Sequence, residues 1–586
     1  MLKDVVIAAC LIAACLAASA VAFTASSSPR HATPVTAAAL PLGATIGRGA
    51  SVPFDEYEAE NGATNGEIIG PDRGFGALAA EASGRRAVRL NGVGGYVEIV
   101  LAHKANAVTL RYALPDSADG RGLDGAIGVW ADGERLGELK LTSRYGWFYG
   151  AYPFSNNPAD GRPHHFYDET RLRFARVLPA GARVRFAVDH ADAAPWRVLD
   201  LADFELVGPP VRPPRGALSV LDFGADPNGA ADSAVAFDRA IATGRATRRP
   251  VYIDPGDYRI DRHLVVDRVT LAGAGPWYSV LHGAGVGLYG PPPPGGARNV
   301  VLRDFAIFGD VTDRDDKAKL AGVGGAMSDT LIENLWIQHE KNGLWFDGPM
   351  RGVTARNLRI LDETADGLNF DRGVSDAVVE NSFVRNTGDD GLASWSHVAP
   401  NRNIVFRHNT VIAPILANGI ALYGGAGALV SDNLVADTVA EGGGYHLGAR
   451  FSATPFEGAI TFRRNVAVRA GGTDPNWRSG VGAFWLYALD RPISGADIRV
   501  EALDLIDSTY DAILLKGGVI EGIAFADVRI DGAGTHALQV QASGIATFSD
   551  VRAQRVRDSG VAMCGSDFTV RGRGNSGWAD VSCPAR

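Results

Sequence analysis

Three aspartates carry the chemistry that stands out first in this sequence. Asp366 and Asp390 each open an Asp-Gly-Leu triplet, 24 residues apart, and Asp389 directly precedes the second triplet. Crowded carboxylates are costly, because each one raises the pKa of its neighbours and each ionised form requires water. Such a cluster provides both a proton-holding carboxyl and a carboxylate base, the two roles that acid–base hydrolysis requires. We therefore expect a catalytic cluster at these three residues.

An internal repeat determines how these acids are placed. The pattern apolar-x-Asn/Asp-apolar recurs at intervals of 23 to 32 residues, except for one interval of 62 that leaves room for a further repeat near Asp504. A second phase, in which Asn or Asp is followed by Gly and an apolar residue, recurs at intervals of 24, 24 and 28. Its members are Asn342, Asp366, Asp390 and Asn418. This period predicts a right-handed parallel β-helix. The Leu-x-x-Leu-x-Leu spacing of leucine-rich repeats is absent.

Stacked rungs would bring the three acids together. Asp366 and Asp390 would occupy equivalent places on adjacent turns, ~4.8 Å apart, with Asp389 displaced sideways. A diagonal pair could reach the ~6.5–9.5 Å that inverting glycoside hydrolysis uses to accommodate a water molecule. We expect Asp389 to act as the acid and Asp366 with Asp390 to act as base and water-holders. The alternative is a ladder of structural turn residues, but it does not account for two adjacent acids beside Trp395.

Aromatic side chains near the repeat could bind sugar rings. Trp345, Trp395, Tyr423 and Trp485 are the candidates for this contact, and His397 could line the same cleft. Each of these residues could instead pack in the core or at its rim, and a lone histidine is more often structural.

The chain divides into two units of β structure. Short alternating runs such as Tyr96–Val100 and Val184–Val188 predict an antiparallel β-sandwich over residues 54–208. A Pro-rich linker follows at 209–216. Residues 217–586 form the predicted β-helix, with one helix expected at Asp232–Thr243, capped by Asp232 or Ser233. The predicted fold class is all-β, a β-sandwich (jelly-roll) followed by a right-handed parallel β-helix.

The N-terminus predicts export. Residues 1–23 resemble a signal peptide and residues 24–53 a flexible lead-in. We expect a secreted, extracellular protein with no membrane contact after cleavage. An uncleaved anchor or lipid attachment at Cys15 are the alternatives. Cys564 and Cys583 could form a disulfide in an oxidising compartment.

The net charge of the chain indicates which class of ligand it binds. A formal net charge of −9 gives no broad basic face, which argues against nucleic acid and favours a neutral ligand. No Cys or His cluster has zinc spacing. We expect a monomer.

At this point the sequence resembles glycoside hydrolase family 87, the α-1,3-glucanases and mycodextranases. The resemblance covers roughly residues 215–565 and is carried by Ile332–His339, Gly343–Pro349, Ala365–Phe370 and Thr387–Ser396. It implies a right-handed β-helix, inversion, three catalytic aspartates at Asp366, Asp389 and Asp390, and α-1,3-glucan or nigeran (mycodextran) as the polysaccharide. No catalytic cofactor is implied. The Gly-Asp-Asp core also resembles family 28 polygalacturonases, but their Gly-His-Gly and Arg-Ile-Lys motifs are absent.

The first unit resembles carbohydrate-binding modules of families 6 and 35, through Tyr57–Glu60, Gly94–Val97 and Asp200–Leu206. The resemblance implies a structural Ca²⁺ held by Glu58, Glu60 and Asp203. The aromatic stretches Tyr145–Tyr149 and Pro163–Tyr167 could bind sugar or contact the β-helix.

Two other functions compete with hydrolysis. A polysaccharide lyase on the same solenoid would need a Lys or Arg base and uronate-binding Ca²⁺, and no such base accompanies the acids. A non-catalytic glycan-binding solenoid would not need all three aspartates.

Overall fold

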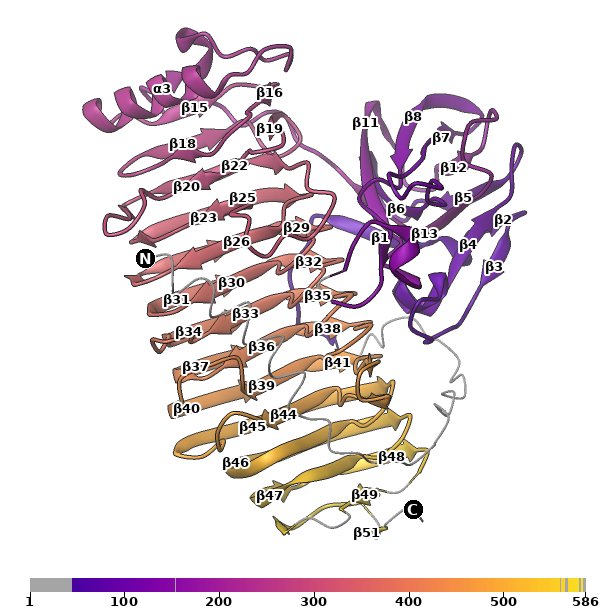
Figure 1. Ribbon diagram of the computed structural model, residues 1–586. Coiled ribbons are helices and arrows are strands. Elements are labelled where there is room, and N and C mark those ends of the chain that lie inside the picture. Colours follow the sequence, from indigo (N-terminus) through magenta and orange to yellow (C-terminus); the bar gives the residue numbers. More distant parts are fainter. Residues whose placement is uncertain (1–44, 153, 559, 564–566, 579–580, 583–586) are drawn as a thin grey trace.

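The computed structural model describes residues 45–152, 154–558, 560–563, 567–578 and 581–582. Two β units lie side by side: a sandwich at residues 54–205 and a long solenoid from residue 218 onward (Figure 1). Within the described residues, no helix has the length and apolar character needed to cross a membrane. The predicted signal peptide, Cys564 and Cys583 lie outside the described residues.

The sandwich consists of two antiparallel sheets around an apolar core that includes Val88, Leu110, Val129 and Phe186. The alternating runs noted in the sequence form its strands, because side chains two apart face the same core. One sheet contains β1 (Phe54–Glu58), β3 (Glu67–Ile69), β4 (Ala87–Leu90), β6 (Ala105–Ala113), β11 (Asp168–Leu178) and β13 (Arg197–Glu205). The other contains β2 (Ala63–Thr64), β5 (Tyr96–Val100), β7 (Asp124–Ala131), β8 (Glu134–Thr142) and β12 (Arg183–Ala187).

Among the described residues, the solenoid is one continuous parallel sheet of 34 strands that coils into a β-helix, as the repeat predicts. Each turn contributes strands to three sides. The first side contains β26 (Asn342–Asp347), β30 (Leu368–Asp371), β33 (Leu392–Trp395), β36 (Ile420–Tyr423), β39 (Tyr445–Ala449) and β44 (Phe484–Ala488). The second contains β28 (Val353–Arg356), β31 (Val374–Glu380), β34 (Arg402–Arg407) and β37 (Gly425–Ser431), and the third β29 (Arg359–Leu361), β32 (Phe383–Arg385), β35 (Thr410–Ile412), β38 (Leu434–Ala436) and β41 (Val466–Val468).

Asparagines at the corners of the rungs have two different structural roles. Asn334, Asn357 and Asn381 adopt positive φ, the conformation that Asn tolerates better than most residues. Farther along, the preceding residue takes the positive φ, and the asparagine points inward as a buried ladder of Asn409, Asn433 and Asn465. The single Asn/Asp pattern noted in the sequence therefore corresponds to two local structures. In the earlier turns the asparagine itself has positive φ, and in the later turns it follows a residue with positive φ and points inward. The expected rung near Asp504 is present, because Asp504 pairs with Val466 of the preceding turn.

The helix α3 (Ala234–Thr247) covers the first turns of the solenoid (Figure 1). It buries Phe237 and Ile241 but exposes Val235. Asp232 provides an oxygen for the backbone N–H of Ala234, whereas the Ser233 side chain makes no capping bond. The helix continues through Gly244, beyond the predicted end at Thr243.

The sandwich packs against the third side of the solenoid through buried charges. Arg385 is fully buried and donates to Glu169 at 2.7 Å, to Asp203 at 2.7 Å and to Glu56 at 3.0 Å. Arg359 pairs with Glu205 at 2.6 Å. An arginine fork surrounded by three carboxylates fixes the relative position of the two units, because each group would otherwise be a charge without a partner.

Part of the predicted flexible lead-in contacts the solenoid. Gly49 donates to the carbonyl of Asp432, Ala50 to the Thr410 hydroxyl and Ser51 to Asn381. The prediction of a free lead-in is therefore wrong for residues 49–51. The linker also lies on the solenoid, since the Val211 N–H donates to the Ala274 carbonyl at 2.8 Å.

Candidate active site

The two Asp-Gly-Leu triplets lie at the corner between the third and first sides of adjacent turns. The Gly343 N–H donates to the Asp366 carbonyl at 3.1 Å, and the Gly367 N–H donates to the Asp390 carbonyl at 3.0 Å. The following residues Leu368 and Leu392 are register partners. Asn342, Asp366, Asp390 and Asn418 therefore form one column, as the sequence predicts. One side-chain oxygen from each of Asp366, Asp389 and Asp390 lies within 4.8 Å of the others.

Asp390 is held as a hydrogen-bond acceptor. Asn418 donates to Asp390 Oδ1 through its backbone at 2.8 Å and its side chain at 2.9 Å, and the Tyr423 hydroxyl donates to Oδ2 at 2.9 Å. Trp485 donates in turn to Asn418 at 2.7 Å. Burial, followed by the nearby Asp389, raises the pKa of Asp390 to about 7, and the bonds from Asn418 and Tyr423 oppose that shift.

Asp366 has weaker support. Its Oδ2 accepts from the side chains of Asn342 and Asn369, each at 3.3 Å. Burial raises the pKa of Asp366 well above its usual value, and the charges of Asp389 and Asp390 raise it further. Asp366 is therefore the member of the cluster that most readily holds a proton.

Asp389 contacts a cation that sequence reasoning did not identify. Arg314, in the segment 309–320 between β22 (Val301–Phe308) and β23 (Ala321–Gly324), donates to Asp389 Oδ2 at 2.5 Å and to the Gly388 carbonyl at 3.0 Å. The Asp389 side chain is 23 % exposed, whereas Asp366 and Asp390 are buried. No repeat or motif marks Arg314, since the segment that holds it interrupts the repeat.

The acid spacing is shorter than the sequence argument required. Carboxyl groups of an inverting pair are typically ~6.5–9.5 Å apart, but one oxygen of each acid here lies within 4.8 Å of the others. The closest side-chain oxygens of the three acids therefore lie nearer to one another than the diagonal separation predicted from the stacked turns.

Glu441 is a further acid that the sequence did not single out. Burial and the charges of Asp474 and Asp389 raise its pKa to about 7. It comes from a turn farther along the solenoid, where Ala440 pairs with Leu416, so only the coiling of the chain brings it near the cluster.

The predicted sugar-binding aromatics fall into two groups. Trp345 and Trp395 point outward from the first side and are half-buried, so part of each ring remains available to a ligand. Tyr423 and Trp485 are 5 % and 1 % exposed. Trp485 stacks on His446 with ring centroids 3.9 Å apart. Because the rings of Tyr423 and Trp485 are covered, the prediction that they contact sugar is wrong for this structure. Tyr423 donates to Asp390, and Trp485 donates to Asn418, which in turn holds Asp390.

His397 lies at the rim of the same face. Its ring stacks on Trp395 at 4.4 Å, and its Nδ1 is 3.8 Å from Asp371. Burial and the nearby Arg372 lower its pKa. His397 therefore positions Trp395 and remains 22 % exposed toward solvent.

The predicted calcium ligands only partly fit one site. Asp203 Oδ2 accepts from Arg385 at 2.7 Å, and its Oδ1 is buried without a hydrogen-bond partner among the described residues. Glu58 and Glu60 are close in sequence, and each has one buried oxygen without a hydrogen-bond partner among the described residues. Burial raises the pKa of both, and for Glu58 the charges of Asp200, Glu56 and Glu60 add to the shift.

The aromatic stretches of the sandwich contact the solenoid. Tyr145 stacks on His339 with centroids 3.7 Å apart, and Phe148, Phe154, His164 and His165 line a small apolar cavity together with Thr364 and Gly388 of the solenoid. Of the two roles left open by the sequence, contact with the β-helix is the one observed.

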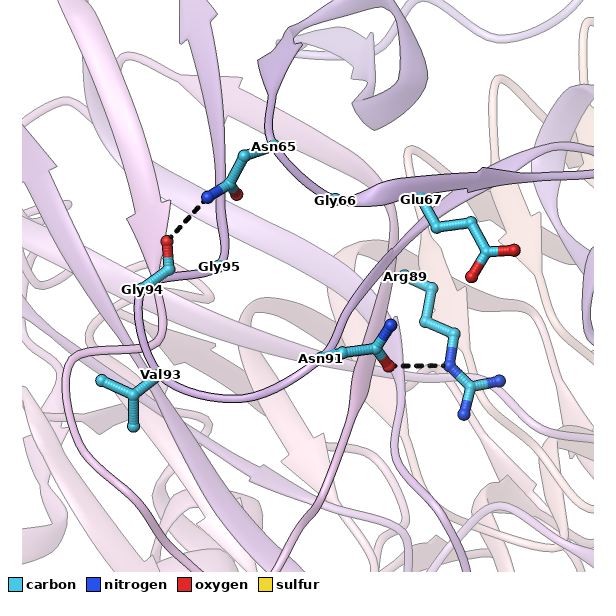
Figure 2. Close-up of a pocket in the computed structure, with 8 residues that line it drawn as sticks. All are labelled: Asn65, Gly66, Glu67, Arg89, Asn91, Val93, Gly94 and Gly95. Carbon is cyan, nitrogen blue, oxygen red and sulfur yellow. Dashed lines mark hydrogen bonds between the residues drawn. The ribbon is translucent and has the colours of Figure 1, made fainter.

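A separate open hollow lies on the sandwich, away from the acids. Figure 2 shows Asn65, Glu67, Arg89 and Asn91 around it. Asn65 donates to the Gly94 carbonyl at 3.0 Å and Arg89 to Asn91 at 3.1 Å, so these polar groups bond to one another. None of the predicted site residues lines this hollow.

Comparisons with known proteins agree with the geometry. Residues 51–207 match the family model "alpha-1,3-glucanase catalytic domain D1", and residues 231–546 match "alpha-1,3-glucanase catalytic domain D2". The sandwich is thus matched as part of a catalytic unit, and a carbohydrate-binding module is not what the comparison finds. A search of curated proteins gives no match.

Solved structures resemble the whole described chain. The catalytic unit of the thermostable GH87 α-1,3-glucanase from Streptomyces thermodiastaticus strain HF3-3 is 38% identical with a TM-score of 0.82, covering 91% of this chain and 98% of that one. The Agl-KA catalytic domain is 26% identical with a TM-score of 0.83, covering 90% and 99%. A GH87 α-1,3-glucanase catalytic domain in complex with nigerose is 25% identical with a TM-score of 0.78, covering 90% and 100%.

The matched domains together cover both β units, and the acid cluster lies inside the second. The chain belongs to glycoside hydrolase family 87, the α-1,3-glucanase family, and is a glycoside hydrolase.

Proposed function

We propose that this protein hydrolyses α-1,3-glucosidic bonds in α-1,3-glucan or nigeran, using Asp366, Asp389 and Asp390. The observation that carries the proposal is the convergence of three carboxylates within 4.8 Å at one corner of the solenoid, on the side whose strand β33 ends in the half-buried Trp395. The α-glucan substrate is supported by relatives described as α-1,3-glucanases and solved in complex with nigerose and with tetrasaccharides.

We assign the roles of the three acids by which of them a bound substrate could contact. A general acid must contact the glycosidic oxygen of a substrate in the cleft, and Asp389 is the only partly exposed member of the cluster. Asp366 and Asp390 lie beneath it, where they would hold and deprotonate the attacking water. Asp389 is therefore the proposed acid and the buried pair the proposed base.

Inversion of the anomeric carbon is proposed from the resemblance to the family alone, because the acid spacing does not support it. Proton NMR of the first product tests the point. A β-anomer formed first from an α-linked glucan supports inversion, and an initial α-anomer contradicts it.

The central experiment compares Asp366→Asn and Asp389→Asn with the wild-type protein. Purified glucans with α-1,3, alternating α-1,3/α-1,4 and β-1,3 linkages, and polygalacturonate, are assayed for soluble reducing ends. We expect release from the two glucans that contain α-1,3 linkages, loss of release in both variants, and nearly unchanged thermal unfolding. Full activity in either variant, or product from polygalacturonate only, would contradict the proposal. The second outcome would support a family 28-like or lyase reaction instead.

We also propose that Glu58 and Glu60 bind a structural Ca²⁺, because each has one buried carboxylate oxygen without a hydrogen-bond partner among the described residues, and Ca²⁺ prefers oxygen ligands. Thermal unfolding with EDTA and then with added Ca²⁺ tests this. We expect the midpoint to fall with EDTA and to recover with Ca²⁺, and Glu60→Gln should remove the dependence.

Secretion and a monomeric state are further proposals, and the N-terminal sequence supports the first of them. Mass spectrometry of the protein recovered from culture medium should find an N-terminus near residue 23. Light scattering should give a mass close to that of one chain.

A further inference from the structure

The segment 309–320 brings Arg314 to the catalytic acids. All three guanidinium nitrogens have partners: Nη2 donates to Asp389 Oδ2 at 2.5 Å, Nη1 to the Gly388 carbonyl at 3.0 Å and Nε to Asp316 at 2.9 Å. The side chain is only 7 % exposed. Because the guanidinium is planar and its donors are fixed, these contacts set both the position of the cation and the direction of the Asp389 carboxylate.

The sandwich holds this segment in place. The ring of Tyr152 lies against the Arg314 guanidinium at 5.0 Å, and its hydroxyl donates to Asp316, the same residue that accepts from Arg314 Nε. Asn156 donates to the Thr312 carbonyl at 2.7 Å. Two further contacts anchor the start of the segment: Tyr145 and Arg144 reach Asp310 at 2.7 Å and 2.6 Å.

The charge of Arg314 acts on Asp389 and Asp366. Burial, which lowers the pKa of Arg314, is outweighed by Asp389 and Asp316, which raise it above its usual value, so the group stays a cation. Arg314 also opposes the rise in the pKa of Asp366. Among the described residues, Arg314 is the positively charged side chain that donates a hydrogen bond to one of the three clustered aspartates.

We propose that Arg314, held by Tyr152 and Asp316, is a positioning residue that aims the Asp389 carboxyl group and stabilises the carboxylate left once Asp389 has donated its proton, so that the β-sandwich completes the active site. This inference rests on the proposed function for the role of Asp389. It assigns the sandwich a task in catalysis that needs no sugar contact of its own.

Substitution of Arg314 should change the pH profile as well as the rate. In Arg314→Met the cation that opposes the rise in the pKa of Asp366 is lost, so the limb of the kcat/KM profile governed by Asp366 should move to higher pH. Under the proposed roles this is the acidic limb, because Asp366 belongs to the pair that acts as the base. We expect kcat to fall at least tenfold while KM changes less, and Arg314→Lys to restore the pH limb but not the full rate.

Tyr152 provides the link to the sandwich. Tyr152→Ala should lower kcat and shift the same limb in the same direction, and Tyr152→Phe should lie between Tyr152→Ala and the wild type. The matched control is Arg351→Met, an exposed arginine on the solenoid strand β27 (Met350–Arg351) with no contact to the cluster. The control should behave as the wild type.

A second readout does not depend on substrate. Hydrogen exchange across residues 309–320 should become faster in Tyr152→Ala than in wild type or Arg351→Met, with the thermal midpoint nearly unchanged. Unaltered exchange in Tyr152→Ala would overturn the anchoring, and an unmoved pH profile with kcat within twofold of wild type in Arg314→Met would overturn the positioning role. Failure of the proposed function looks different: an inactive wild-type protein or a fully active Asp389→Asn variant, with the exchange result still deciding the anchoring.

Discussion

At the scale of single residues, Asp390 shows how the environment of an acid differentiates chemically identical groups. Three donors from Asn418 and Tyr423 point at its two oxygens, whereas Asp366 receives only two longer bonds. Donors stabilise a carboxylate in its ionised form. The base character of the buried pair therefore belongs mainly to Asp390, and the proton held by the pair belongs mainly to Asp366.

The Tyr423 hydroxyl offers a test of that difference. Tyr423→Phe keeps the buried ring but removes a hydrogen bond to a charged group, worth about 1.5–3 kcal/mol. We expect kcat/KM to fall about tenfold or more. The acidic limb of the pH profile should move to higher pH, since Asp390 loses a donor that favours its ionised form. Steady-state kinetics across pH measure both effects.

The control for this substitution is Tyr278→Phe, which removes a hydroxyl bonded to the Gly208 carbonyl at the linker. It should leave the kinetics unchanged. A Tyr423→Phe variant with the wild-type rate and pH profile would show that Tyr423 only fills space.

At the scale of elements, the rungs are held in register by buried amides as well as by apolar stacking. Asn433 Oδ1 accepts from the Asn409 backbone at 2.9 Å and side chain at 3.1 Å, and its own side chain donates to Asn465 at 3.1 Å and to the Phe406 carbonyl at 2.9 Å. All three asparagines are buried. The ladder therefore satisfies backbone groups that the corners would otherwise leave without partners.

Truncation in the middle of this ladder should destabilise the solenoid strongly. Asn433→Ala leaves several buried donors and acceptors unpaired, each costing about 1–3 kcal/mol, so we expect a loss of about 3 kcal/mol or more in the free energy of unfolding. Urea denaturation followed by circular dichroism measures it. Asn228→Ala, at an exposed position before the helix α3, should be nearly neutral. Equal stability of the two variants would contradict the structural role of the ladder.

At the scale of the whole molecule, the interface between sandwich and solenoid is rich in buried acids. Burial raises the pKa of Glu56 and of Glu81 to about 7, and those of Asp200 and Asp203 to about 6. For Glu56, the charge of Asp203 adds to the effect of burial. The arginines Arg385 and Arg111 oppose these shifts without abolishing them.

Because the pKa values of these acids are raised in the folded protein, we expect its stability to depend on pH in an unusual way. The folded chain holds their protons up to about pH 6–7, whereas the unfolded chain releases them near its ordinary carboxyl values, so stability should fall as the pH rises from about 5 to 8. Two buried histidines oppose this trend below their unfolded value: burial lowers the pKa of His164 to about 4 and of His165 to about 3. The four acids outnumber the two histidines, so the net loss of stability should be clearest between about pH 5 and pH 7, where the folded acids still hold protons that the unfolded chain has released.

Thermal unfolding between pH 5 and pH 7 measures this, with a lower midpoint expected at pH 7. Glu81→Gln should reduce the slope, since it removes one of the acids that is protonated only in the folded state. A midpoint that rises over this interval would contradict the assignment of these acids as proton-holding groups.

The sequence by itself determined the β-helix, the acid column and the enzyme family. Repeats at 23–32 residues can coil in few ways, because stacked parallel strands require one turn per repeat, and Asp366 and Asp390 share a place in that repeat. It also named Trp395 and Trp345 as candidates for sugar contact, and both rings are only half-buried in the structure.

Only the tertiary structure decided what surrounds the acids. Arg314 comes from a segment outside the repeat and Tyr152 from another unit, so no spacing relates either of them to Asp389. Burial of Tyr423 and Trp485, the pairing of Asp203 with Arg385 and the raised pKa values all depend on which surfaces are in contact. Contacts that recur from turn to turn follow from the repeat in the chain. Contacts between segments outside the repeat depend on how those segments pack, and these contacts give each of the three acids a different environment.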